Sequence, residues 1–139
     1  LAAAIPSRRA VAPVGARLRA ATRCEVVTAG PLRLVGAGAD DCDLDVGGDL
    51  IAMTPGAGLR GGSARVGGRV RVRELACRSG APLRIVLDGS ATADDVLTAD
   101  VVGAGVEVVA AGGTLRFDRR HTGVRVGLAA GRPVLAAAA

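Results

Sequence analysis

The sequence contains no lysine, asparagine, glutamine, tryptophan or tyrosine, and its single aromatic residue is Phe117. Hydrophobic residues still make up 50% of the 139 residues, so low hydrophobicity gives no reason to expect disorder. A chain of this length has the usual size of one domain. Because large rings are absent, the core must consist of Val, Leu, Ile and Ala. Such a core suits thin layers of stacked small side chains better than a globule around aromatic anchors.

Cysteine and histidine are scarce. Cys24, Cys42 and Cys77 are odd in number and far apart, without a CxxC pair, and His121 has no second ligand close in sequence. We therefore expect no zinc site, no disulfide framework and no cofactor. The cysteines are interpreted as small buried thiols in a reducing compartment. No GxSxG motif surrounds any serine, so the sequence does not indicate hydrolase chemistry.

Long apolar runs are missing as well. No run of about 18 apolar residues free of charge occurs, so we expect no membrane-spanning helix and no membrane partner. The glycine-rich stretches "GGSARVGG" (61–68) and "GAGAD" (36–40) lack the Lys-Ser/Thr ending and the third glycine, respectively, of nucleotide-binding loops. We interpret both as corners of the backbone, and we expect no small-molecule substrate.

All 18 basic residues are arginines, and the net charge is +5. This charge would favour phosphate contacts, but the arginines are spread along the chain and no rings are present to stack bases. We therefore do not expect a nucleic-acid partner. Arg69, Arg71 and Arg73 alternate with Val70 and Val72, as is typical of the solvated face of a strand. An interaction face for an anionic partner at these three arginines remains the alternative.

The chain repeats itself at a spacing of twenty residues. The stretch "DLDVGGDLIA" (43–52) aligns with "SARVGGRVRV" (63–72), and a looser copy, "VVTAGPLRL", precedes both. Such self-similarity is typical of stacked, repeating architectures. The alignment predicts that inward residues of the two copies lie one above the other, namely Leu44 over Ala64, Val46 over Val66, Leu50 over Val70 and Ala52 over Val72.

Between the repeats, short segments alternate apolar and polar residues with period two, which predicts half-buried strands. Glycine pairs separate them, and we expect these pairs to form sharp turns with positive backbone angles at Gly47, Gly48, Gly67, Gly68, Gly112 and Gly113. Since hexapeptide repeats are not sustained, the pattern favours an all-β fold of the right-handed parallel β-helix type, a β-solenoid, with a short C-terminal capping hairpin. A β-sandwich is the alternative.

The expected solenoid covers residues 23–135, after an irregular or frayed segment at 1–22 and before a disordered tail at 136–139. Within it, helical signal is confined to Ser90–Val102. There Ser90 or Thr92 would serve as a cap and Asp94 and Asp95 would lie in the first turn, so we expect one or two helical turns.

The densest group of carboxylates is Asp40, Asp41, Asp43 and Asp45. Alternation places Asp41, Asp43 and Asp45 on one side of a strand, with apolar residues on the other. We interpret this side as a solvated face. The alternatives are a cation site and the catalytic carboxylates of a carbohydrate-active β-helix enzyme, although no known calcium-loop pattern fits.

Two stretches resemble the flagellar assembly protein A family. Residues 61–89, "GGSARVGGRVRVRELACRSGAPLRIVLDG", follow the order of its central coils, with Glu74 and Leu75 matching and Ala76-Cys77 replacing the usual Gly-Ser. Residues 101–135 resemble its closing segment. Larger members carry a helical hairpin between these stretches and an N-terminal domain, and this chain has only Ser90–Asp100 there.

The resemblance implies a cytoplasmic, non-enzymatic scaffold that contributes no catalytic residues. We therefore expect a structural module that binds a protein partner or self-associates through the ends of the solenoid. The C-terminal segment would cap one end, and the other end, near Arg23, would be open. A bactofilin-like cytoskeletal polymer, which joins solenoids end to end, is the alternative scaffold.

Overall fold

The computed structural model describes residues 4–6, 9–12, 16–23, 25–78, 82–88 and 93–135, and within these ranges it is all β without a helix. The strands are β1 (Ala4–Pro6), β2 (Arg9–Ala12), β3 (Ala16–Thr22), β4 (Glu25–Thr28), β5 (Leu32–Val46), β6 (Leu50–Ala52), β7 (Gly58–Val66), β8 (Val70–Ala76), β9 (Leu83–Leu87), β10 (Ala93–Val102), β11 (Glu107–Ala110), β12 (Gly113–Arg116), β13 (His121–Ala129) and β14 (Arg132–Leu135). Cys24 and the expected tail at 136–139 lie outside the described residues.

Each coil of the chain adds a short parallel strand to three stacks, which we name faces A, B and C. Long strands such as β5 bend around corners and serve more than one face. Face A contains residues 9–12, 25–28, 43–46, 62–66, 84–86 and 107–109. Face B contains 16–18, 32–34, 50–52, 70–72 and 97–99. Face C contains 4–6, 20–22, 38–40, 58–60, 74–76 and 101–102.

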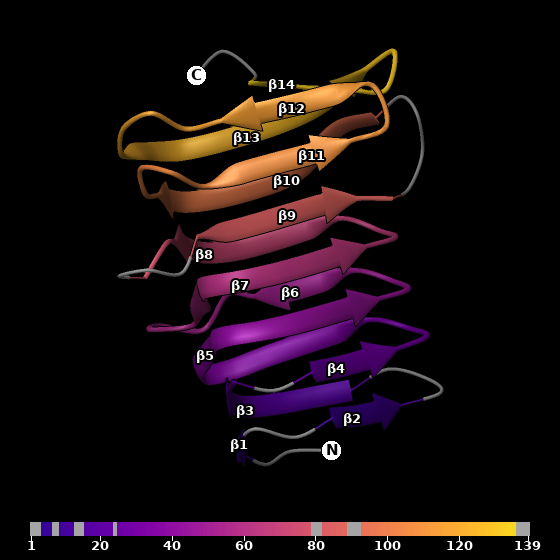
Figure 1. Cartoon of the computed structure of the whole chain (residues 1–139), viewed down its shortest axis with the longest axis vertical. Coiled ribbons are helices and arrows are strands. Elements are labelled where there is room, and N and C mark those ends of the chain that lie inside the picture. Colours follow the sequence, from indigo (N-terminus) through magenta and orange to yellow (C-terminus); the bar gives the residue numbers. More distant parts are fainter. Residues whose placement is uncertain are drawn as a thin grey trace.

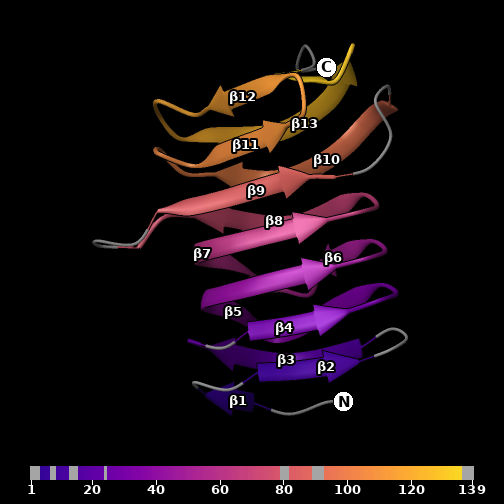
Figure 2. The same cartoon turned by 45° about the vertical axis from the view of Figure 1, so that its right-hand side comes forward.

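These stacks form a right-handed β-solenoid, so the predicted fold class is confirmed and the β-sandwich is excluded. In Figure 1 the chain climbs from the N-terminus at the bottom, and the near strands β7 and β9 run to the right. The far strands β6 and β8 run to the left, and Figure 2 shows the same course after a turn of the view. A path that rises while it turns in this sense is a right-handed coil.

The register confirms the alignment that the repeat predicted. Leu44 pairs with Ala64 and Val46 with Val66 on face A. On face B, Leu50 pairs with Val70 and Ala52 with Val72. Twenty residues separate the members of each pair, so one turn of the solenoid there is one sequence repeat.

Small aliphatic side chains stack into columns inside the coil. On face B, one column is fully buried over five levels and consists of Leu32, Leu50, Val70, Leu97 and Val126. The only aromatic residue, Phe117, is also buried. Each inward residue is covered by its counterparts in the coils above and below, so one coil alone would leave these apolar side chains in water.

The glycine pairs at the corner from face A to face B differ from the prediction. Gly47, Gly48, Gly67 and Gly68 are absent from the glycines with positive φ. They are needed for space instead. A Cβ on Gly67 would lie 2.5 Å from the carbonyl oxygen of Gly47, and one on Gly48 would lie 2.8 Å from the nitrogen of Pro31. The coils approach too closely at this corner for any side chain.

The hairpin pair Gly112-Gly113 also lacks positive φ. Gly112 lies at the tip of the β11–β12 hairpin, where its N–H donates to the carbonyl of Gly131 at 2.9 Å. A Cβ on Gly112 would approach the carbonyl carbon of Gly131 within 2.8 Å. Close packing between two hairpin tips therefore replaces the expected turn geometry here too.

Left-handed backbone occurs at other corners, including the corner from face C to face A. Arg23 (φ 48°), Asp41 (φ 53°) and Gly61 (φ 72°) occupy equivalent places in successive coils there. Gly61 adopts this conformation without strain, whereas a left-handed residue with a side chain costs about 1–2 kcal/mol, less for Asp than for most.

The expected helix at Ser90–Val102 is wrong. The described part of this segment, from Ala93, is the strand β10, which pairs with β8 in parallel and with β13 antiparallel. Leu97, Ala99 and Val102 are buried on its inner side, and Asp95 (φ 50°) lies at an irregularity in the register. The β-branched residues of Val96–Val102 and the free edge of β8 outweigh the local helix signal.

The C-terminal segment closes the stack by reversing direction, as the capping prediction required. β12 runs antiparallel to β11, and β13 and β14 add two antiparallel strands to β10. Figure 1 shows these strands together at the top of the molecule. The last coil is therefore covered by chain that no longer follows the solenoid path.

The N-terminal segment 1–22, expected to be irregular, carries strands in its described parts. β1 pairs with β3, β2 pairs with β4, and β3 pairs with β5, all in parallel and in register. Sixteen residues separate the paired positions in this first coil, for example Ala4 and Ala20. The coils thus continue past Arg23 to Ala4, without the glycine pair that marks the later repeats.

Candidate interaction surface

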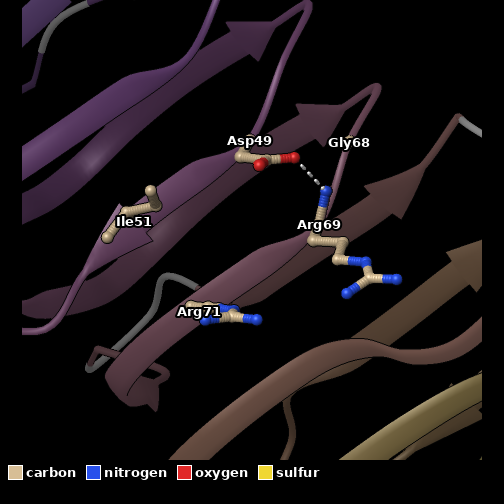
Figure 3. A pocket seen from close by; sticks show the side chains of 5 residues that line it. All are labelled: Asp49, Ile51, Gly68, Arg69 and Arg71. Atoms are coloured by element: carbon tan, nitrogen blue, oxygen red, sulfur yellow. Dashed lines mark hydrogen bonds between the residues drawn. The ribbon is translucent and has the colours of Figure 1, made fainter.

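The predicted arginine face lies on β8, on the outside of face B. Val70 and Val72 point into the core, and Arg69, Arg71 and Arg73 are exposed. Arg69 and Arg71 line a shallow hollow together with Asp49, Ile51 and Gly68 (Figure 3). The alternation along β8 therefore placed all three arginines correctly on the outer side of the strand.

The carboxylate of Asp49, which lines the hollow, already has a hydrogen-bond partner. Asp49 Oδ1 accepts the backbone N–H of Arg69 at 2.8 Å. Figure 3 shows the guanidinium of Arg69 directed away from this carboxylate. The fixed position of Asp49 orders the corner and leaves the guanidinium groups of Arg69 and Arg71 in solvent.

Arg73 behaves differently from the other two arginines. Its Nε donates to the carbonyl oxygen of Met53 at 2.8 Å, and its Nη1 lies 3.2 Å from Asp100 Oδ2. These contacts connect the coils below and above Arg73. The side chain therefore serves the solenoid itself, and only Arg69 and Arg71 of the predicted face keep their charge for a partner.

A fourth arginine, Arg33, joins this surface, and the sequence reasoning missed it. Arg33 pairs with Ile51, and Ile51 pairs with Arg71, so the three form one outward column on face B. Arg33, Arg69 and Arg71 are exposed, and among the described residues none has a carboxylate within 4.0 Å. We name these three arginines the basic face. The repeat spacing, 18 residues and then 20, was the signal that could have found Arg33.

The acidic cluster divides between two surroundings. Asp40 Oδ1 accepts a hydrogen bond from Arg60 Nε at 2.7 Å, and Asp40 Oδ2 lies 3.6 Å from Arg78 Nη1. Asp41 lies 3.8 Å from Arg78 and holds its Oδ1 buried without a hydrogen-bond partner. Arginines from later coils therefore face both carboxylates at this corner. A cation site would need carboxylates that are not already paired with arginines.

Arg60 bridges three successive coils on face C. Besides Asp40 below, its Nη1 contacts Glu74 Oε1 above at 3.2 Å. Burial lowers the pKa of Arg60, but hydrogen bonds and Coulombic attraction from Asp40 and Glu74 outweigh burial and raise it. This arginine stays charged and holds the coils together, which is a structural role.

Asp43 and Asp45 are exposed on face A, with Leu44 and Val46 buried between and beyond them, as alternation predicted. Asp43 accepts a hydrogen bond from the hydroxyl of Ser63 at 2.9 Å. Among the described residues, no group of three or more His, Cys, Asp or Glu side chains is arranged to hold a metal ion. The cluster that looked continuous in sequence is thus two arginine-facing acids and two solvated ones.

The remaining candidate groups do not meet. His121 Nδ1 lies 2.8 Å from the carbonyl oxygen of Arg119, and its ring packs edge-on against Phe117. Cys42 is buried and Cys77 is half-buried. Among the described residues, neither thiol contacts His121.

Comparison with known proteins yields no relatives. No protein family, no curated protein and no solved structure matches the chain. Among the described residues, no helix is long and apolar enough to cross a membrane.

Proposed function

We propose that this β-solenoid is a non-enzymatic structural scaffold, which binds a protein partner or further copies of itself through the end of its coil. The resemblance to the flagellar assembly protein A family suggests such a role. The stack also has the rigidity that a scaffold requires, because inward columns connect successive coils and Arg60 bridges three of them through Asp40 and Glu74.

The observation that carries the proposal is the strand edge at the N-terminal end of the described coils. Within the described residues, β1, β2 and the 16–18 part of β3 are each paired on one side only along faces C, A and B. Unpaired backbone N–H and C=O groups of this kind accept a further strand. Three such edges around one coil fit another coil added in register.

The opposite end is built against such addition. Its outer strands β12 and β14 have four residues each, and β14 contains Pro133, which has no N–H to donate. Short edges and edge prolines are devices that prevent strand pairing. A bactofilin-like polymer that grows through both ends therefore has less support than association through the first coil.

The carbohydrate-active alternative has less support, because the acidic cluster is divided between two surroundings. Paired carboxylates for sugar cleavage must flank a substrate from one surface. Asp40 and Asp41 are engaged by Arg60 and Arg78, whereas Asp43 and Asp45 lie on face A in solvent. Only Asp43 and Asp45 therefore remain together on one exposed face, and the four carboxylates do not act as one cluster.

Hydrogen–deuterium exchange at two protein concentrations tests the proposal. We expect amides of β1, β2 and residues 16–18 to gain protection as the concentration rises from about 5 to about 200 µM, because association pairs their free edges. Sedimentation velocity on the same samples should show larger species over the same range.

The C-terminal strands provide the internal control for this experiment. Protection confined to β12 and β14, where Val134 and Leu135 are exposed, would move the contact to the wrong end. Unchanged exchange at the first coil, both with concentration and with candidate partner proteins, would overturn the end-association proposal.

A further inference from the structure

Two patches of opposite charge lie on different faces of the solenoid. The basic face, Arg33, Arg69 and Arg71, lies on face B. Asp43 and Asp45 lie on face A, and Glu25 pairs with Asp43 from the strand below, so we name Glu25, Asp43 and Asp45 the acidic face. All six side chains are exposed.

Within the acidic face, Asp43 and Asp45 keep charge available for a partner. Asp43 accepts one hydrogen bond, from Ser63, which leaves lone pairs on both carboxylate oxygens. Asp45 pairs in register with Arg65, but the guanidinium of Arg65 lies near Asp88, at 3.9 Å, rather than near Asp45. Asp45 has no ion pair among the described residues.

The two patches match in spacing. Asp43 and Asp45 are two residues apart on β5, and Arg69, the residue before β8, is two residues from Arg71 on that strand. Along a parallel strand two residues span about 6.6 Å, so the backbone positions of the two pairs have about the same spacing. Guanidinium and carboxylate groups also match as donor fork and double acceptor.

We propose that the basic face of one copy binds the acidic face of a second copy, so that solenoids lie side by side with their axes parallel. The contact pairs Arg69 and Arg71 with Asp43 and Asp45. It deepens the proposed function, on which it rests, by adding a lateral contact to the contact at the first coil.

The contact is directional. Different faces of the two copies meet, so it is a heterologous interface that leaves a second basic face and a second acidic face unused. The aspartates lie one coil below the arginines in the stack, so neighbouring copies are offset by one coil, about 4.8 Å. Repetition of such a contact, which rises by one coil at each step, produces an open helical assembly of solenoids.

Other anionic partners fit the basic face less well. Nucleic-acid strands are held by stacking on aromatic rings, and the sole aromatic residue of the sequence is the buried Phe117. A flat sheet face also offers no element that enters a duplex groove. The acidic face of a second copy supplies carboxylates at the required spacing.

A single lateral contact is weak, because all its charges are exposed and screened by salt. Two copies that associate through their first coils present the contact twice, and multivalency then strengthens it without new interactions. The contact should therefore be detectable at low ionic strength and should disappear at high ionic strength.

Charge reversal tests the pairing. We would compare Arg71→Glu, Asp45→Arg and their equimolar mixture by sedimentation velocity, at about 20 and about 500 mM NaCl. Arg116→Glu and Asp118→Arg are the matched controls, since they change the net charge equally at exposed positions outside both patches. Circular dichroism would establish that each variant is folded.

At low salt, we expect each single reversal to lower the association constant by about tenfold or more, because like charges then face each other. The mixture should recover association, since the unaltered acidic face of one variant meets the unaltered basic face of the other. The control variants should associate as the parent chain does.

Two results would overturn the lateral contact. One is a parent chain whose association at low salt is unchanged by both reversals. The other result has two parts. Poly-glutamate, polyphosphate or phosphatidylglycerol vesicles bind the parent chain but not Arg71→Glu, and Asp45→Arg still self-associates as the parent chain does. Exchange protection at the first coil reports the end contact separately, so either contact can fail while the other stands.

Discussion

Gly47 and Gly67 stack directly, and the carbonyl oxygen of Gly47 occupies the place where a side chain on Gly67 would begin. The same relation holds between Gly47 and Ala29 one coil lower. Hydrogen bonds run along this corner, from Gly67 N–H to Val46 O at 2.8 Å and from Gly68 N–H to Gly48 O at 2.9 Å. The hydrogen-bond ladder of the sheet thus continues through this corner. The neighbouring backbones approach each other so closely there that only glycine fits.

Gly67→Ala should therefore destabilise the fold by about 2–3 kcal/mol, because the new methyl group forces the coil away from the backbone of its neighbour. Gly103→Ala is the matched control. Its Cβ would meet no atom closer than 3.6 Å, and its φ is not positive. Urea denaturation of both variants gives the free energies of unfolding, and equal losses would contradict the close-approach explanation.

Residues whose role depends on other coils were hard to predict. The pairing of Asp40 with Arg60 and Arg78 depends on coil lengths, which change from 18 to 20 residues along the chain. Arg33 escaped notice for a related reason. Leu32 and Leu34 flank it as Val70 and Val72 flank Arg71, but 18 residues separate Arg33 from Ile51, whereas 20 separate Ile51 from Arg71. The alternation within one strand, in contrast, correctly placed Arg69, Arg71, Asp43 and Asp45 outside.

At the scale of elements, β10 is where sequence reasoning failed. Asp94 and Asp95 after Ser90 and Thr92 resemble the first turn of a helix, and that signal is local. The segment from Val96 onward fills the position between β8 and β13, where its backbone gains hydrogen bonds on both sides. Tertiary pairing of this kind routinely outweighs helix propensity.

The acid–base pair Asp95–Arg125 joins β10 to β13. Two hydrogen bonds of 2.9 and 2.8 Å connect the guanidinium to the carboxylate. The hydrogen bond from Arg125, with weaker attraction from Arg69 and Arg71, lowers the pKa of Asp95 below its ordinary value of 3.8. A lowered folded-state pKa stabilises the fold above the unfolded-state pKa, and this stabilisation is lost as the pH falls through the folded-state pKa.

We expect the parent chain to be more stable than Asp95→Asn by a constant margin above about pH 5, with the margin shrinking below about pH 4. Denaturation curves across this range measure it. Asp118→Asn, an exposed aspartate without an ion pair among the described residues, is the control and should show no such trend. A margin for Asp95→Asn that stays constant down to pH 2 would contradict the role of the pair.

At the scale of the whole molecule, the solenoid was predictable because the residues that repeat in the sequence are those that stack on each other in neighbouring coils. A glycine pair followed by alternating valines and leucines fixes both the corner and the inward column. The first coil, with sixteen residues and no glycine pair, gave no such signal, so its strands were not expected. The chain reversal at β12 and β13 was expected as a cap, and it ends the parallel stack.

Nuclear Overhauser contacts between assigned methyl groups test the stacking of successive coils most directly. Paired inward residues on neighbouring strands lie about 5 Å apart, so strong contacts are expected for Val46 with Val66, Leu50 with Val70 and Ala52 with Val72. If these pairs show none, and each methyl group instead contacts residues of an antiparallel neighbour, the solenoid and the surfaces built on it are wrong.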